Sequence, residues 1–192
     1  MRQFTHYFTP TERLLWCASV LCIVLSFLLF DGTDYFTLAA SLIGATSLIF
    51  CARGNPIGQV LMIVFSLLYG WISYTFAYYG EMITYLGMTM PLAVIALVTW
   101  LRHPFGGNRA EVEVNRLPPQ EILLGFLASL AVTAVFYFIL RHFNTANLLP
   151  STLSVTTSFF AVYLTLRRSP FYALAYAAND VVLIVLWVLP SM

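Results

Sequence analysis

The sequence predicts an all-α integral membrane protein, a bundle of helices that cross a lipid bilayer. Of the 192 residues, 60% are hydrophobic and only 9% are charged, whereas a soluble domain usually carries about 25% charged residues. The apolar residues form runs near the roughly 20 residues that a helix needs to cross the hydrocarbon core. Charged and turn-forming residues separate these runs, as they do in multi-pass membrane proteins.

Seven spans follow from the positions of the charges, within a single membrane domain of residues 1–192. The first apolar run is followed by DGTDYF rather than by a small-residue cleavage site, so it is a membrane helix and not a removable signal peptide. Very short connections mean that most helices turn straight back into the membrane. We place the spans at residues 14–30, 35–52, 57–79, 82–101, 122–140, 149–166 and 171–189.

Arginine placement predicts the orientation. The chain has no lysine, so its nine arginines carry the whole positive-inside signal. Eight of them fall on one side of the membrane if the amino terminus is cytoplasmic, and Arg141 alone falls on the other side, together with Asp31, Asp34 and Glu81. We therefore expect a cytoplasmic amino terminus and a cytoplasmic loop at residues 102–121, which reads as a small hairpin or an extended segment.

Several functional classes are disfavoured. A net charge of +1 is far from the strong positive charge that is typical of nucleic-acid-binding domains. Cys17, Cys22 and Cys51 lack the C-x-x-C spacing of a zinc or redox site, and we expect no metal and no cofactor. Motifs of metalloproteases, serine hydrolases and P-loop enzymes are absent, so the sequence does not predict an enzyme.

A weak internal repeat is visible. Residues 45–56 and 157–170 each combine a hydroxyl-bearing helix with an arginine-and-proline corner that leads into the next span. Spans two to four would form one triplet, span five a linking helix, and span six the start of a second triplet, which gives parallel repeats. The last helix of that second triplet is absent from this sequence, so we expect a natural chain that extends further.

Polar groups inside the last span mark the first candidate site. Asp180 reads as the only carboxylate well inside a span, and such a group is costly in a bilayer. Asn179 precedes it, while Tyr172 and Tyr176 lie on about the same helical face. Aromatic rings beside a hydrogen-bonding group suit a flat heterocycle joined to a polar sugar. The alternatives are a polar pair that packs helices for Asp180 and Asn179, and an interfacial anchor for Tyr172.

Other spans supply further candidates for a substrate site. Span six carries a stripe of hydroxyls, some of which are expected to bond only to their own helix. Span four also contains Pro91, which should bend it. The candidates outside the last span are Ser151, Ser154 and Ser158 on span six, Tyr85 and Thr89 on span four, and Gln59 and Tyr69 on span three.

Two stretches, beginning GNPIGQVLMIVFSLLYGW and LLPSTLSVTTSFFAVYLTLRRSPF, resemble the PnuC vitamin transporters over about residues 34–187. The resemblance implies a three-plus-one-plus-three fold related to SWEET proteins, here with an extra amino-terminal helix, in a homotrimer of the bacterial plasma membrane. It also implies facilitated diffusion of nicotinamide riboside, a vitamin B3 form used in NAD biosynthesis, with a cytoplasmic kinase trapping the substrate.

The resemblance carries over unevenly to individual residues. Tyr176 and Asp180 match the second aromatic and the polar position of the family's signature in the last span, while Ala173 stands where a tryptophan is usual. Ser151 replaces a frequent aspartate, and Tyr85 aligns with a usual glutamine. Because relatives carry thiamine, riboflavin or deoxynucleosides, these departures bear on the substrate more than on the fold.

The sequence thus predicts a uniporter for nicotinamide riboside or a close analogue. One rival is a proton-coupled carrier of another vitamin, in which Asp180 titrates. A second rival is a membrane partner subunit that does not itself transport.

Overall fold

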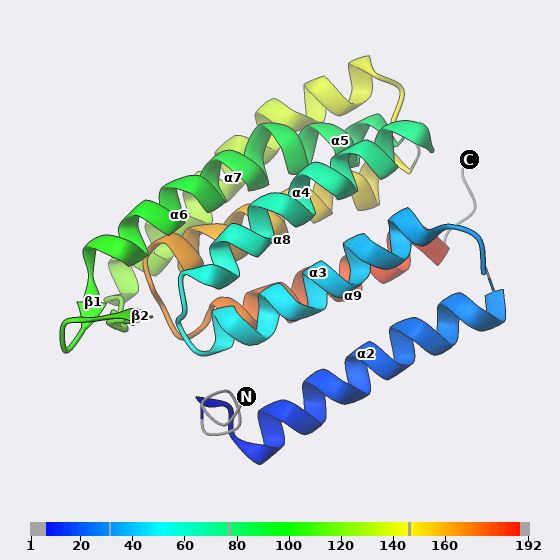
Figure 1. Ribbon diagram of the computed structural model, residues 1–192. Helices are drawn as coiled ribbons and strands as arrows, with labels where there is room; N and C mark the ends of the chain where they lie inside the picture. Colours follow the sequence, from blue (N-terminus) through cyan, green and yellow to red (C-terminus); the bar gives the residue numbers. More distant parts are fainter. Residues whose placement is uncertain (1–6, 31, 77, 146, 189–192) are drawn as a thin grey trace.

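The computed structural model describes residues 7–30, 32–76, 78–145 and 147–188, which form long helices and one short β-hairpin (Figure 1). The two strands, β1 (Pro104–Phe105) and β2 (Asn108–Val112), pair antiparallel in the loop after α6. The helices are α2 (Pro10–Phe30), α3 (Tyr35–Ala52), α4 (Ile57–Thr75), α5 (Tyr79–Thr84), the π-helical turn η1 (Tyr85–Thr89), α6 (Met90–Arg102), α7 (Pro119–His142), α8 (Leu148–Leu166) and α9 (Tyr172–Val188).

Membrane-length helices dominate this chain. Within the described residues, six helical segments are long and apolar enough to cross a bilayer: α2, α3, α4, the continuous α5–η1–α6 segment, α7 and α8. The last helix, α9, is apolar but has 17 residues, and its predicted end at Leu189 lies outside the described residues. The structure therefore confirms the predicted multi-pass helical bundle.

The third predicted span ends earlier than expected, at Thr75 rather than at Tyr79. The backbone turns after Phe76, where the Tyr78 N–H donates to the Ser73 carbonyl over 2.8 Å. Tyr79 therefore opens α5 instead of closing α4. Apolar residues continue through this turn, so hydropathy alone placed the boundary four residues late.

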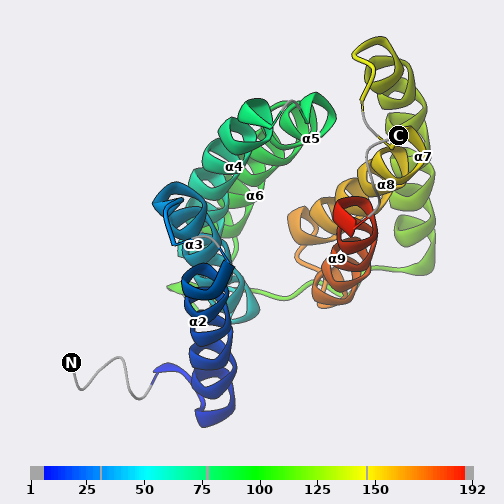
Figure 2. The ribbon, with the colours of Figure 1, turned by 90° about the vertical axis from the view of Figure 1, so that its right-hand side faces the viewer.

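The helices form two groups. In the first group α3 packs against α2 and α4, and α4 packs against α6; in the second group α8 packs against both α7 and α9. Contacts between α6 and α8 join the groups. Figure 2 shows α2 to α6 on one side and α7 to α9 on the other, connected by the loop after α6.

The fourth span, in which the sequence predicts a bend at Pro91, is interrupted by the π-turn η1. Pro91 has no N–H to bond to the carbonyl of Gly87, and its ring would crowd that carbonyl in a regular α-helix. The Met90 N–H instead reaches the carbonyl of Tyr85, five residues back. Such single π-turns widen a helix locally and are frequent at functional sites.

Two corners with the same backbone bonding connect α3 to α4 and α8 to α9. At the first corner the Asn55 N–H donates to the Phe50 carbonyl over 2.9 Å; at the second the Ser169 N–H donates to the Leu164 carbonyl, also over 2.9 Å. These bonds cap helix ends in the Schellman manner. The equivalent residues (55 and 169, 50 and 164) are 114 positions apart, so the weak repeat in the sequence corresponds to a repeated helical hairpin.

A segment of the loop after α6, residues 103–118, lies across both corners, and we call it the strap. Its Val112 N–H donates to the Gly54 carbonyl over 2.9 Å, and its Asn115 N–H donates to the Arg168 carbonyl over 3.0 Å. Gly54 and Arg168 are equivalent corner residues, and both have a left-handed backbone, with φ of 66° and 58°. The strap therefore ties the two hairpins together at the arginine-rich end.

A small apolar cluster fills the space under the strap. Cys51, Trp100 and Val112 are buried there, and Tyr172 of α9 packs against them. The Trp100 indole N–H donates to the Thr165 carbonyl over 3.0 Å. Because side chains from α3, α6, α9 and the strap meet in this cluster, the end of the bundle that carries the corners is closed.

Each corner also carries an ion pair with the preceding helix. Arg53 pairs with Glu12 in the first turn of α2 at 3.0 Å, and Arg167 pairs with Glu121 in the first turn of α7. The hydrogen bond to Glu121 raises the pKa of Arg167 above its ordinary value, against the opposing effect of burial. Thus each hairpin is joined by an ion pair to the first turn of the helix that precedes it.

One sequence interpretation is wrong. Asp180 is not the only carboxylate inside a span, because Glu81 lies in the first turn of α5 and is 3% exposed. The Ser154 hydroxyl donates to Glu81 Oε1 over 3.3 Å. Glu81 was expected in an outer loop because charges were used to mark span ends. The fourth span begins at Tyr79, however, so it includes Glu81.

Candidate functional site

A cavity of about 670 Å³ lies between the two helical hairpins, within the usual range for small-molecule sites. It extends from the middle of the bundle to the beginning of α3, at the end away from the strap. The residues that line it are Ile23, Asp34, Thr37, Ala40, Ser41, Gly44, Ala45, Leu48, Met62, Phe65, Tyr69, Ile72, Phe76, Tyr85, Thr89, Ser158, Val162, Tyr176, Asn179, Asp180 and Leu183.

One wall of the cavity is aromatic. The ring centroids of Tyr69 and Tyr85 are 4.3 Å apart, and the Phe65 ring meets Tyr85 edge-on at 5.9 Å. The π-turn matters here, since Tyr85 begins η1 while Phe65 and Tyr69 lie one turn apart on α4. Such a wall offers stacking and edge contacts to a flat ring.

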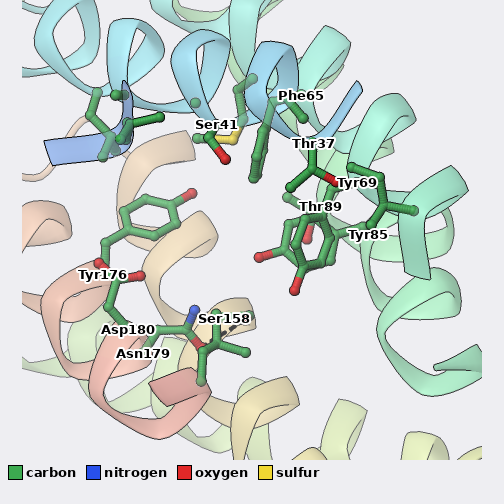
Figure 3. Close-up of a pocket in the computed structure, with 18 of the residues that line it drawn as sticks. Thr37, Ser41, Phe65, Tyr69, Tyr85, Thr89, Ser158, Tyr176, Asn179 and Asp180 are labelled. Atoms are coloured by element: carbon green, nitrogen blue, oxygen red, sulfur yellow. Dashed lines mark hydrogen bonds between the residues drawn. The ribbon is translucent and has the colours of Figure 1, made fainter. Parts of the chain in front are cut away.

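The opposite wall is polar and belongs to α8 and α9. Figure 3 shows Tyr176, Asn179 and Asp180 across the cavity from Tyr69 and Tyr85. Asn179 is 3% exposed, and its Oδ1 accepts a hydrogen bond from Ser158 over 2.8 Å. Asp180 is exposed to the cavity, so a ligand can reach its carboxylate.

Asp34 lies near the mouth of the cavity, where it also caps α3. Its Oδ1 accepts the N–H groups of Phe36 and Thr37 over 3.1 and 3.0 Å, and its Oδ2 accepts the Thr37 hydroxyl over 2.5 Å. The hydrogen bonds from Thr37 hold the pKa of Asp34 below its ordinary value. The cap therefore keeps a negative charge at the cavity entrance at neutral pH.

The cavity gathers seven of the residues predicted from the sequence as candidates. They come from four helical segments, which the sequence alone could not bring together. The seven are Tyr69, Tyr85, Thr89, Ser158, Tyr176, Asn179 and Asp180.

Four other candidates lie elsewhere. Tyr172 belongs to the apolar cluster under the strap. Gln59 is buried and its amide contacts Cys51 Sγ at 3.5 Å. Ser154 bonds to Glu81, and Ser151 is buried in the first turn of α8. These side chains hold helices together rather than line the cavity.

Several lining residues were not predicted from the sequence, and Phe65 is the most informative. It is one of sixteen phenylalanines, most of which would be expected to face lipid or other helices. The repeat supplies a signal that could have found it, because Phe65 and Asn179 are 114 positions apart, as are the equivalent corner residues. Once Asn179 is taken as a candidate, the same register identifies Phe65.

Among the described residues, no group of three or more histidine, cysteine, aspartate or glutamate side chains could hold a metal ion. The side chains that line the cavity offer stacking, hydrogen bonding and charge.

Comparison with known proteins shows which family this chain matches and which solved structure shares its fold. The family described as nicotinamide mononucleotide transporter matches residues 34–192. The nicotinamide riboside transporter PnuC of Neisseria mucosa is 27% identical over 177 residues, which cover 90% of this chain and 67% of that protein. The crystal structure of the vitamin B3 transporter PnuC shares the fold with a TM-score of 0.81, at 24% identity, over 94% of this chain and 77% of that one.

Membrane-length helices around a central cavity, together with these matches, define a multi-pass bacterial membrane transporter and not an enzyme. The chain belongs to the nicotinamide mononucleotide transporter family.

Proposed function

We propose that this protein carries nicotinamide riboside or a close analogue across the bacterial plasma membrane by facilitated diffusion. The observation that carries the proposal is the cavity with an aromatic wall on α4 and η1 and a carboxylate and an amide on α9. A pyridinium ring can stack against Tyr69 and Tyr85, whose faces attract a cation. The ribose hydroxyls can then bond to Asn179 and Asp180.

The proposal includes a trapping step outside the membrane. Facilitated diffusion only equalises concentrations, so net uptake needs a reaction that consumes the substrate inside. A cytoplasmic kinase that phosphorylates the riboside would supply this, because the added charge prevents return through an apolar bundle. The transported vitamin would feed NAD biosynthesis.

The proposed architecture is a single domain of residues 1–192 that follows the three-plus-one-plus-three pattern, with two helices of the second triplet in this sequence. Its support is the pair of equivalent corners, with α3 and α4 in one triplet, α7 as the linker, and α8 and α9 in the other. The extra helix α2 precedes the first triplet. A homotrimer is proposed from the family resemblance, and its mass in lipid nanodiscs tests it.

The proposed orientation puts the arginine-rich corners and the strap in the cytoplasm. Arg53, Arg102, Arg109, Arg116, Arg167 and Arg168 support it, since they all lie at that end of the helices, whereas Arg141 closes α7 at the opposite end. A cysteine at Asn147 should then react with a membrane-impermeant reagent added from outside intact cells. Reaction only from the cytoplasmic side would reverse the assignment.

The experiment that tests the substrate is direct binding to purified protein. Nicotinamide riboside should bind, and Tyr69→Ala should weaken binding about fivefold or more because stacking contributes about 1 kcal/mol. Tyr74→Ala is the matched control, since Tyr74 faces outward beside Trp71. If the protein binds thiamine or riboflavin but no riboside, the proposed substrate is wrong.

A second candidate function, proton-coupled transport, is favoured by one observation. Glu81 is a buried carboxylate in the same helical segment as Tyr85, and buried carboxylates in spans often carry protons. If this candidate is right, Glu81→Gln should abolish uptake driven by a pH gradient while binding persists.

A further inference from the structure

The two hairpins present equivalent positions to the cavity. Each lining residue of α8, and all but Asp180 on α9, has a counterpart 114 positions earlier that also lines the cavity. The pairs that matter most are Gly44 with Ser158 and Phe65 with Asn179. Gly44 and Ser158 lie on the first helix of each hairpin, and Phe65 and Asn179 face them from the second helix.

In the first hairpin, Phe65 of α4 faces Gly44 of α3, which has no side chain. A Cβ atom on Gly44 would lie 3.1 Å from Cδ2 and Cε2 of Phe65, closer than ordinary van der Waals contact. The Phe65 ring therefore rests against the surface of α3 that a glycine leaves open. This contact aims an apolar ring at the cavity.

In the second hairpin, the equivalent partner is a hydroxyl. Ser158 donates to Asn179 Oδ1 over 2.8 Å, and Thr157 donates to the same oxygen over 2.7 Å. With both hydroxyls on its oxygen, the Asn179 amide is fixed about its last torsion. Figure 3 shows the Asn179 nitrogen turned away from Ser158 and toward the cavity.

We propose that Ser158 is a positioning residue, which acts through Asn179 and sets the hydrogen-bonding specificity of the cavity. It holds the amide so that Nδ2 offers an N–H donor to the ligand. Asp180, the next residue, offers a carboxylate acceptor to the same cavity. A donor beside an acceptor matches neighbouring sugar hydroxyls, one of which accepts a hydrogen bond while the other donates. The inference rests on the proposed function, of which it specifies the sugar subsite.

This assignment differs from a direct contact between Ser158 and the ligand. The Ser158 hydroxyl has one proton, and that proton points at Asn179. Both residues line the cavity, and because the hydroxyl proton is used by the Asn179 oxygen, the donor that remains for the ligand is the amide N–H. A loss on removing the hydroxyl should then depend entirely on Asn179.

A double-mutant cycle tests this dependence. The affinity for nicotinamide riboside is measured by titration calorimetry for the wild type, Ser158→Ala, Asn179→Ala and the double variant, with melting temperatures alongside. Ser158→Ala should weaken binding about fivefold because the Asn179 oxygen then keeps only the Thr157 hydroxyl and the amide is held less firmly. The double variant should bind as Asn179→Ala does, with no further loss.

Two further variants serve as controls. Ser158→Thr keeps the hydroxyl and should keep most of the affinity. Thr152→Ala removes another hydroxyl of α8, one that donates to the Leu148 carbonyl of its own helix. This variant should leave the affinity unchanged.

Each outcome decides the inference. Non-additive losses at unchanged melting temperature support it, whereas additive losses show that Ser158 contacts the ligand itself and overturn it. Unchanged affinity in Ser158→Ala overturns it as well. A folded wild-type protein that binds no nicotinamide riboside contradicts the proposed function and removes the sugar subsite with it.

Discussion

Asp180 is the residue on which sequence and structure agree most closely. The sequence singled it out because a carboxylate is costly inside a span, and the structure opens it to the cavity beside Asn179 and Tyr176. Its helical spacing from Tyr176 was enough to put the two side chains on one face. What periodicity could not reveal was the other wall of the cavity.

Changes at Asp180 should separate ligand binding from helix packing. Asp180→Asn keeps the shape and removes the charge, and Asp180→Ala also removes the acceptor. Both should weaken binding of nicotinamide riboside, the alanine variant more, by about tenfold as expected for a hydrogen bond to a charged group. Affinity and melting temperature are measured together on the purified variants.

If Asp180 only packs helices, the variants should lose melting temperature while the folded fraction keeps its affinity. Wild-type affinity in well-folded Asp180→Ala would remove this residue from the site.

Glu81 and Phe65 show why the remaining residues were beyond sequence reasoning. Glu81 was taken as a marker of a span end, since a lone charge near a turn usually is one. Its burial depends on the Ser154 hydroxyl from another helix, which is a tertiary contact. Phe65 carries no chemical signal of its own, and its place opposite Asn179 depends on the register between two hairpins.

At the scale of elements, most helix boundaries were predictable because charges, glycine and proline punctuate the apolar runs. The second span, residues 35–52, coincides with α3. The boundary between the third and fourth spans was not predictable, because apolar residues continue across the turn. The π-turn was anticipated only as a bend at Pro91, since its location depends on which carbonyl the Met90 N–H reaches.

The corner between α3 and α4 gives a test at this scale. Gly54 has a φ of 66°, and an added Cβ would lie 3.0 Å from Val112 Cγ1. Gly54→Ala should therefore destabilise the protein by about 1 kcal/mol, because alanine is strained in the left-handed region and the strap must shift. The measurement is the melting temperature in detergent.

Gly32→Ala is the matched control for the corner, since a Cβ there meets nothing within 4 Å. Equal melting temperatures for both variants would mean that the corner does not depend on glycine.

At the scale of the whole molecule, the cavity is closed toward the strap and extends to the opposite end. The apolar cluster of Cys51, Trp100 and Val112 separates it from the arginine-rich face. Release of a ligand on that face requires the two corners to move apart, and the strap spans both of them. Transport should therefore break the bond between Asn115 and Arg168.

A disulfide across this contact should stop transport without stopping binding. Cysteines replace Asn115 and Arg168 in a background with Cys17, Cys22 and Cys51 changed to alanine or serine. Under oxidising conditions, exchange of nicotinamide riboside in proteoliposomes should fall at least about tenfold, because the closed end is locked, and reduction should restore it. Undiminished exchange in fully cross-linked protein would show that this end does not gate.

The central claim is that this chain is a facilitator for nicotinamide riboside, and counterflow tests it most directly. Purified protein is sealed into liposomes loaded with unlabelled nicotinamide riboside, and labelled substrate is added outside without sodium, ATP or a pH gradient. The account predicts transient accumulation of label inside, driven only by exchange, and none in protein-free liposomes. Absence of accumulation, or an absolute requirement for an ion gradient or ATP, would contradict it.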